Sequence, residues 1–106
     1  MRIQRWDVGL DGPLSEDALH RKIESLGFEI VARIYPATLA AAVPGNGRDV
    51  LVGIVRGLVK LSVDADALLL TAGDLAFIPA GCERRVEGVG PSTAVCFEAF
   101  RRLSPS

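Results

Sequence analysis

A short apolar run lies between glycine and charged residues at positions 73–84, which read Gly73-Asp74-Leu75-Ala76-Phe77-Ile78-Pro79-Ala80-Gly81-Cys82-Glu83-Arg84. Leucine, phenylalanine and isoleucine favour a strand over residues 75–78, and the proline and glycine that follow favour a turn. A further strand is expected to begin at Arg84. The stretch therefore predicts two short strands joined by a tight turn, an arrangement typical of β-sandwiches and barrels.

Similar short runs, rich in leucine or β-branched residues, lie on both sides of this stretch. We expect strands at residues 28–35, 50–55, 58–63, 67–70, 84–89 and 93–100. Glycine, proline, serine and aspartate separate these runs, as they do in turns. Many short strands with regular turns predict an all-β jelly-roll barrel.

One short helix is expected before the strands, over about residues 15–26. Ser15 is a good N-cap, and Glu16 and Asp17 place carboxylates in the first turn. Gly27 is a natural residue to end the helix, because it adopts the left-handed conformation readily. Gly9–Pro13, ahead of this helix, is turn-like.

Length and composition narrow the possible classes of protein. The chain has 106 residues, and we expect a single domain over residues 1–106 with the barrel at about 28–101. Its net charge is −1 with no basic tract, so we expect no nucleic-acid partner. No apolar run approaches the roughly 18 residues needed to cross a bilayer, so we expect no membrane partner.

The N-terminus and the cysteines bear on location. Residues 1–7 are charged and lack the apolar core of a signal peptide, so we expect a cytoplasmic protein. Cys82 and Cys96 are then expected to be free thiols. The tail, residues 103–106, is expected to fray.

The quoted stretch resembles the second sequence motif of the cupin superfamily. That motif has a glycine, five residues, Pro-x-Gly, two residues and then a metal-binding histidine. Residues 49–57 resemble the end of the first cupin motif, residues 58–70 the hairpin after it, and residues 95–100 the last barrel strand. The resemblance covers about residues 28–101 and implies a cupin jelly-roll, or double-stranded β-helix, barrel.

The resemblance also implies where a metal would be bound. Cupins that hold a metal use two histidines and a carboxylate from the first motif and one histidine from the second. Here the second-motif position is Arg84, the carboxylate position falls at Val50, and the two histidine positions fall within Val43–Asn46. Arginine stays protonated and offers only donors, so it does not replace a histidine ligand. We therefore expect neither a metal nor another cofactor.

Arg84 is the strongest candidate for binding a ligand. The cupin resemblance implies that its side chain points into the barrel, where a guanidinium suits a carboxylate or phosphate. The alternatives are that Arg84 pairs with an internal acid such as Glu29 or Glu98, or that its head reaches the rim. The further candidate ligand-binding residues are Asn46, Arg48 and Asp49 in a glycine-rich loop, and Cys82.

The loop and Cys82 also have simpler, purely structural interpretations. The loop has the chemistry of a plain turn or of a flexible lid over the barrel mouth. The thiol of Cys82 could have its pKa lowered by Arg84, although a small packed residue is the simpler role. His20 shares a helix face with Glu16 and Glu24, which we interpret as a solvated face with weak ion pairs.

Three functions follow from this sequence. The leading one is a metal-free, non-catalytic cupin that binds a small polar or anionic molecule in the barrel. The first alternative is a divergent metal-dependent enzyme of the dioxygenase, isomerase or decarboxylase type, using Asp49, Asn46 or Glu83.

The second alternative is a structural dimerisation module, which a closed, side-chain-filled barrel would favour. Residues 50–55 are apolar on both faces, so the face outside the barrel needs cover. Small cupins commonly supply that cover with a second subunit, so we expect a homodimer.

Overall fold

The structure is a computed structural model, which describes residues 1–103. The expectation of a frayed tail therefore falls, for residues 104–106, outside the described residues. The elements follow one another as β1 (Arg2–Gln4), α1 (Val8–Asp11), α2 (Glu16–Ser25), β2 (Phe28–Ile34), β3 (Val50–Arg56), β4 (Val59–Val63), β5 (Asp66–Leu70), β6 (Leu75–Ile78), β7 (Arg84–Gly88) and β8 (Val95–Arg101).

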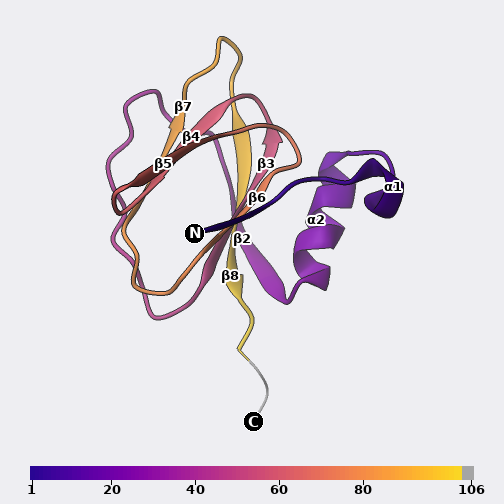
Figure 1. The fold of residues 1–106 in the computed structure, drawn as a ribbon, viewed down its shortest axis with the longest axis horizontal. Helices are drawn as coiled ribbons and strands as arrows, with labels where there is room; N and C mark the ends of the chain where they lie inside the picture. Colours follow the sequence, from indigo (N-terminus) through magenta and orange to yellow (C-terminus); the bar gives the residue numbers. More distant parts are fainter. Residues whose placement is uncertain (104–106) are drawn as a thin grey trace.

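The strands form two antiparallel sheets. The larger sheet has the order β1-β6-β3-β8-β2, and the smaller one has the order β5-β4-β7. They face each other as two layers, with α1 and α2 on the far side of the larger sheet (Figure 1). The all-β jelly-roll prediction is confirmed, with a one-turn helix, α1, in addition to the one helix expected.

The helix predicted at residues 15–26 is α2. The Ser15 hydroxyl accepts the backbone N–H of Ala18, and Gly27 has a φ of +89° just after the helix. The predicted turn at residues 9–13 is wrong in part, because residues 8–11 form the one-turn helix α1. A local interaction explains why helix α1 forms, because the side chain of Asp7 caps it and accepts the backbone N–H groups of Gly9 and Leu10.

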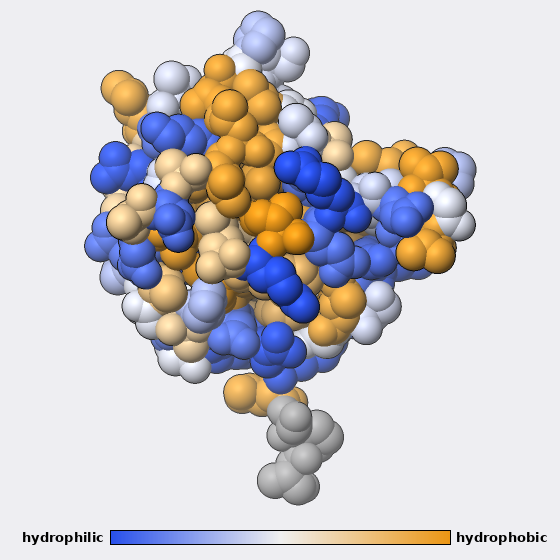
Figure 2. Space-filling view, in the orientation of Figure 1, coloured by the Kyte–Doolittle hydropathy of each residue, from blue (hydrophilic) through white to orange (hydrophobic). Residues whose placement is uncertain are grey.

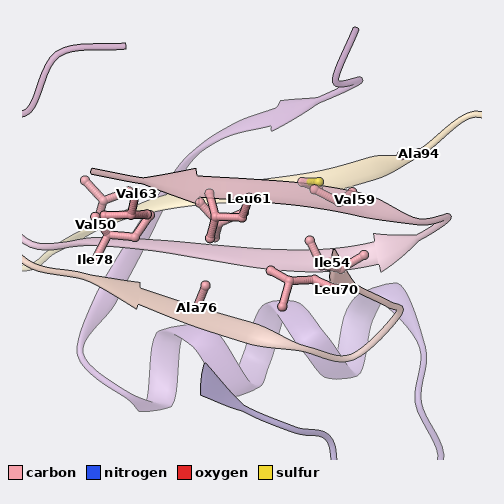
Figure 3. Close-up of a cluster of buried hydrophobic side chains, with 11 residues drawn as sticks. Val50, Ile54, Val59, Leu61, Val63, Leu70, Ala76, Ile78 and Ala94 are labelled. Atoms are coloured by element: carbon pink, nitrogen blue, oxygen red, sulfur yellow. The ribbon is translucent and has the colours of Figure 1, made fainter. Parts of the chain in front are cut away.

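The space between the sheets is filled by apolar side chains. Side chains from facing strands point toward one another between the layers (Figure 3). The buried members of this cluster are Val50, Val52, Ile54, Val59, Leu61, Val63, Leu70, Ala76, Ile78, Ala94 and Cys96. The barrel is therefore side-chain-filled over this part of its length.

Helix α2 covers the outer face of the larger sheet. Leu19 and Ile23 of the helix pack on a second buried cluster that includes Leu51, Leu75 and Phe97. The apolar outer face that motivated the homodimer prediction is thus partly covered within the chain itself. The homodimer stays a prediction.

The segment between β2 and β3 packs along the edge of the smaller sheet. It runs along β7, where the N–H of Gly88 donates to Ala37 and the backbones of Val43 and Arg84 exchange two hydrogen bonds. The carbonyl of Asn46 then accepts the N–H of Gly81 at 2.8 Å. The glycine-rich loop therefore lies against the β6–β7 turn.

No helix among residues 1–103 is long and apolar enough to cross a membrane.

Candidate functional site

The β6–β7 turn positions the candidate site, and two glycines allow it to form. Gly81 has a φ of +84° in the turn, a conformation that favours glycine. Gly73 has a φ of +91°, and a Cβ there would lie 2.7 Å from the Cβ of Trp6. Backbone geometry therefore explains why the motif has glycine at positions 73 and 81. The turn ends at Arg84, which is the first residue of β7.

Arg84 lies inside the barrel, as the cupin resemblance implied. The residue is 3% exposed and stands opposite Val63 of β4, whereas its neighbour Arg85 is exposed. Val86, the next inward residue, packs against the barrel core. The guanidinium is therefore a charged group on the inner face of β7, beside the apolar side chains of Val63 and Val86.

The guanidinium has an acidic partner across the barrel. Its Nη2 donates to Oε2 of Glu98 on β8 at 3.1 Å, and the two side chains are 4% and 21% exposed. Glu29, the other acid considered, is exposed. The alternative of an internal ion pair is thus what the structure shows. A sequence signal for Glu98 existed, since it is the only charged residue between Val95 and Phe100.

The ion pair leaves part of Arg84 without partners. Within residues 1–103, its Nε and Nη1 atoms are buried and make no hydrogen bond. A buried donor without an acceptor lowers the free energy of unfolding by about 1–3 kcal/mol, so buried donors in native structures are rarely without a partner. The Arg84–Glu98 pair therefore still has unused hydrogen-bonding capacity.

The three loop candidates bond elsewhere and are not brought to Arg84. The Asn46 Oδ1 atom accepts the backbone N–H of Arg48, and the Arg48 guanidinium donates to the backbone carbonyl of Arg101. The Asp49 carboxylate accepts the N–H of Ala80 and the Nε of Arg101. These two donors hold the pKa of Asp49 below its usual range.

Cys82 does not have the activated thiol that the sequence left open. Desolvation raises the pKa of this half-buried cysteine, and the carboxylate of Asp64 adds to the effect. The side chain packs against the barrel core, so the role of a small packed residue holds. Cys96 is buried and is also a free thiol.

The residues at the cupin metal positions do not fit a metal. Val50 is a core residue and Arg84 is a guanidinium, so neither supplies a ligand atom. Of the ligands considered for a divergent site, Asp49 and Asn46 accept hydrogen bonds from other groups of the chain, and Glu83 is exposed. Residues 1–103 contain no group of three or more histidine, cysteine, aspartate or glutamate side chains that could hold a metal ion.

His20 contacts Glu24 on its own helix and packs edge to face on Phe97 of β8, with the ring centroids 5.6 Å apart. Its Nδ1 lies 3.0 Å from Glu24, while Glu16 bonds to Arg33 instead. The interpretation from the sequence therefore holds in part, because one ion pair joins residues four apart on the helix and the other reaches Arg33 on β2.

The sequence matches no protein-family model and no curated protein. The structure is similar to that of a predicted oxalate decarboxylase from Thermotoga maritima, with a TM-score of 0.63 and 20% identity over 85% of this chain and 76% of that one. It is also similar to the cupin domain of Cnp3 from Schizosaccharomyces pombe, with a TM-score of 0.60 and 12% identity over 72% and 60% of the two chains.

A third similar structure is the DMSP lyase DddQ from Ruegeria pomeroyi, with a TM-score of 0.58 and 18% identity over 70% of this chain and 39% of that one. These neighbours differ in what they are said to do, and identities of 20% or less carry the fold alone. The two-layer barrel, the motif glycines and these neighbours together show that this chain has the cupin fold.

Proposed function

We propose that this protein binds a small polar molecule inside its barrel, at the Arg84–Glu98 pair, without using a metal. The observation that carries the proposal is the pair of buried, unpartnered atoms Nε and Nη1 of Arg84. A ligand with an acceptor for these donors would remove their desolvation cost. The proposal keeps the position predicted from the sequence and adds Glu98 to it.

The ion pair defines the chemistry of the ligand more narrowly than Arg84 alone. Glu98 neutralises the guanidinium, so an anion would compete with a carboxylate already in place. A neutral ligand with an acceptor beside a donor, such as an amide or a hydroxy-carbonyl compound, matches both members of the pair. The acceptor would face Nε and Nη1, and the donor would face Glu98.

A small-molecule screen by thermal shift tests this proposal. Amides, hydroxy-carbonyl compounds, carboxylates and phosphates are compared on the wild type, Arg84→Met and Arg84→Lys. The matched control is Arg85→Met, which removes an exposed arginine from the neighbouring position of the same strand. We expect polar neutral compounds to stabilise the wild type and the control, and Arg84→Met to reduce their affinity about tenfold.

Two results would contradict the proposal. Equal shifts for the wild type and Arg84→Met would place binding elsewhere, and no shift with any compound would leave the pair a structural one. The metal-free part is tested separately, by elemental analysis of protein whose affinity tag has been removed. Iron, manganese, nickel, copper or zinc near one equivalent per chain would favour the enzyme alternative.

A second candidate function, a dimerisation module, is favoured by strand β5. This edge strand of the smaller sheet exposes Leu68 by 42% and Leu69 by 59%. Apolar residues gather on the face of the molecule that β5 crosses (Figure 2). An exposed apolar edge strand is a template for pairing with another chain.

Light scattering tests this second candidate. We expect the wild type to have the mass of a dimer at micromolar concentration and Leu69→Lys to shift it toward the monomer. Leu39→Lys is the control, since Leu39 is 91% exposed and lies outside the strands. A monomeric mass for the wild type would contradict the homodimer.

A further inference from the structure

A groove of about 400 Å³ lies outside the barrel, where the outer face of the larger sheet extends beyond α2. Its walls include Arg2, Phe28, Asp49, Phe77, Ile78 and Arg101, which come from the ends of five different strands or their flanks. No residue of α2 lines it. The groove is therefore separate from the barrel interior and from the Arg84–Glu98 pair.

Phe77 forms the accessible aromatic part of the groove, whereas Phe28 lies buried beneath it. The rings of Phe28 and Phe77 meet edge to face, with their centroids 5.8 Å apart. Met1 and Pro79, which are not buried, add to the apolar lining. Such a surface suits the hydrocarbon part of a ligand.

An arginine covers each of these rings. The guanidinium carbon of Arg2 lies 4.2 Å from the centre of Phe77, and that of Arg101 lies 4.6 Å from the centre of Phe28. Strand register explains both contacts, because Arg2 pairs with Phe77 and Phe28 pairs with Arg101 across neighbouring strands. Stacking on a ring fixes the guanidinium plane and leaves its N–H groups free for an acceptor.

The two arginines differ in their charge partners. Arg101 donates to Asp49 at 3.0 Å, whereas Arg2 makes no ion pair with any residue from 1 to 103. The side chains that line the groove therefore carry one uncompensated positive charge, on a guanidinium held against an aromatic ring.

We propose that this groove is a second binding site, which takes a small carboxylate with an aromatic or alkyl body. The apolar body lies against Phe77, Met1 and Pro79, and the carboxylate accepts hydrogen bonds from Arg2. Asp49 holds Arg101 in place and opposes binding of a more highly charged anion. The site is independent of the proposed barrel ligand, and either can fail without the other.

An NMR titration of the whole chain with phenylacetate tests the proposal. We expect the amide signals of Phe28, Asp49, Phe77 and Arg101 to shift in a saturable way. Phenylacetamide has the same shape without the charge, and acetate has the charge without the ring. We expect each of these to bind about tenfold more weakly, the effect of losing one charge-assisted hydrogen bond or a ring's burial.

Four variants distinguish specific binding in this groove from non-specific attraction of an anion to a positively charged surface. Arg2→Gln should weaken phenylacetate binding about tenfold, and Arg2→Lys should weaken it less, because lysine keeps the charge but not the planar fork. Arg21→Gln removes an exposed arginine of α2 and should change nothing. Asp49→Asn should strengthen binding severalfold, because it removes the negative charge from the groove.

Several outcomes would overturn the proposal. These are no saturable shift at the four amides, equal binding of phenylacetamide, equal weakening by Arg21→Gln, or weaker binding to Asp49→Asn. Loss of the shifts in Arg84→Met would also overturn it, because binding would then occur in the barrel. Unchanged shifts in Arg84→Met support a separate groove whatever the barrel screen finds.

Discussion

Gly45 and Gly81 touch backbone to backbone at one end of the barrel. A Cβ placed on Gly45 would lie 2.2 Å from the carbonyl carbon of Gly81 and 2.6 Å from the backbone nitrogen of Cys82. Backbone atoms do not move aside as the end of a flexible side chain does. The contact therefore holds the glycine-rich loop against the turn that precedes Arg84, and only glycine fits at position 45.

We predict that Gly45→Ala destabilises the protein by about 1–3 kcal/mol, the usual cost of forcing extra atoms into a packed contact. Gly47→Ala is the matched control in the same loop, since a Cβ there would meet nothing within 4 Å. Gly47→Ala should leave the free energy of unfolding unchanged or raise it by up to about 1 kcal/mol. Urea unfolding of the two variants gives the comparison, and equal stabilities would show that the loop moves freely.

We predict that Arg84 and Glu98 are energetically coupled. Glu98→Gln leaves a buried guanidinium without its counter-charge and should cost about 2 kcal/mol or more, whereas Arg84→Met leaves the more exposed carboxylate and should cost less. In a double-mutant cycle the combined loss should be smaller than the two single losses together, by about 0.5–3 kcal/mol. Additive losses would mean that the pair contributes nothing to stability.

We predict that the two thiols react at very different rates in the folded protein. Burial raises the pKa of Cys96 to about 12, against an ordinary value of 9.0, so its thiolate is about a thousandfold scarcer at pH 8. Half-buried Cys82 has a pKa that is raised as well, but its sulfur is within reach of reagent. Alkylation followed by peptide mass analysis should label Cys82 first and Cys96 only after unfolding. Rapid labelling of Cys96 under native conditions would contradict its burial.

Local sequence was enough to predict the elements that local interactions form. The β6–β7 turn follows from Pro79 and Gly81, and α2 follows from its cap at Ser15 and the glycine at position 27. Strand β1 was missed because three residues carry no alternating pattern, and the strand exists by pairing with β6, far along the chain. The groove was missed for the same reason, since register alone brings Arg2 to Phe77.

The candidate site was predicted in part. The cupin resemblance placed Arg84 inside the barrel, but β8 is apolar on both faces, so the sequence did not show that Glu98 points inward. Strand alternation could have corrected the expectation that Asp49 binds a ligand inside the barrel. Val50 points into the core, so Asp49 points outward, and it bonds to Arg101 rather than to the barrel interior.

The carboxylate of Asp49 should contribute to stability in a pH-dependent way. The Ala80 N–H and the Arg101 guanidinium lower its pKa in the folded state below the ordinary value of 3.8. A carboxyl whose pKa falls on folding stabilises the folded state above its unfolded pKa, and this contribution is lost as the pH falls through the folded value. The stability gap between the wild type and Asp49→Asn should therefore be constant near neutrality and narrow below about pH 4. Arg101→Gln should shrink the gap without abolishing it, because the Ala80 N–H remains the larger cause. Urea unfolding between pH 2.5 and 7 measures both variants, and a gap that stayed constant down to the acid end would show that the pKa of Asp49 is unchanged by folding.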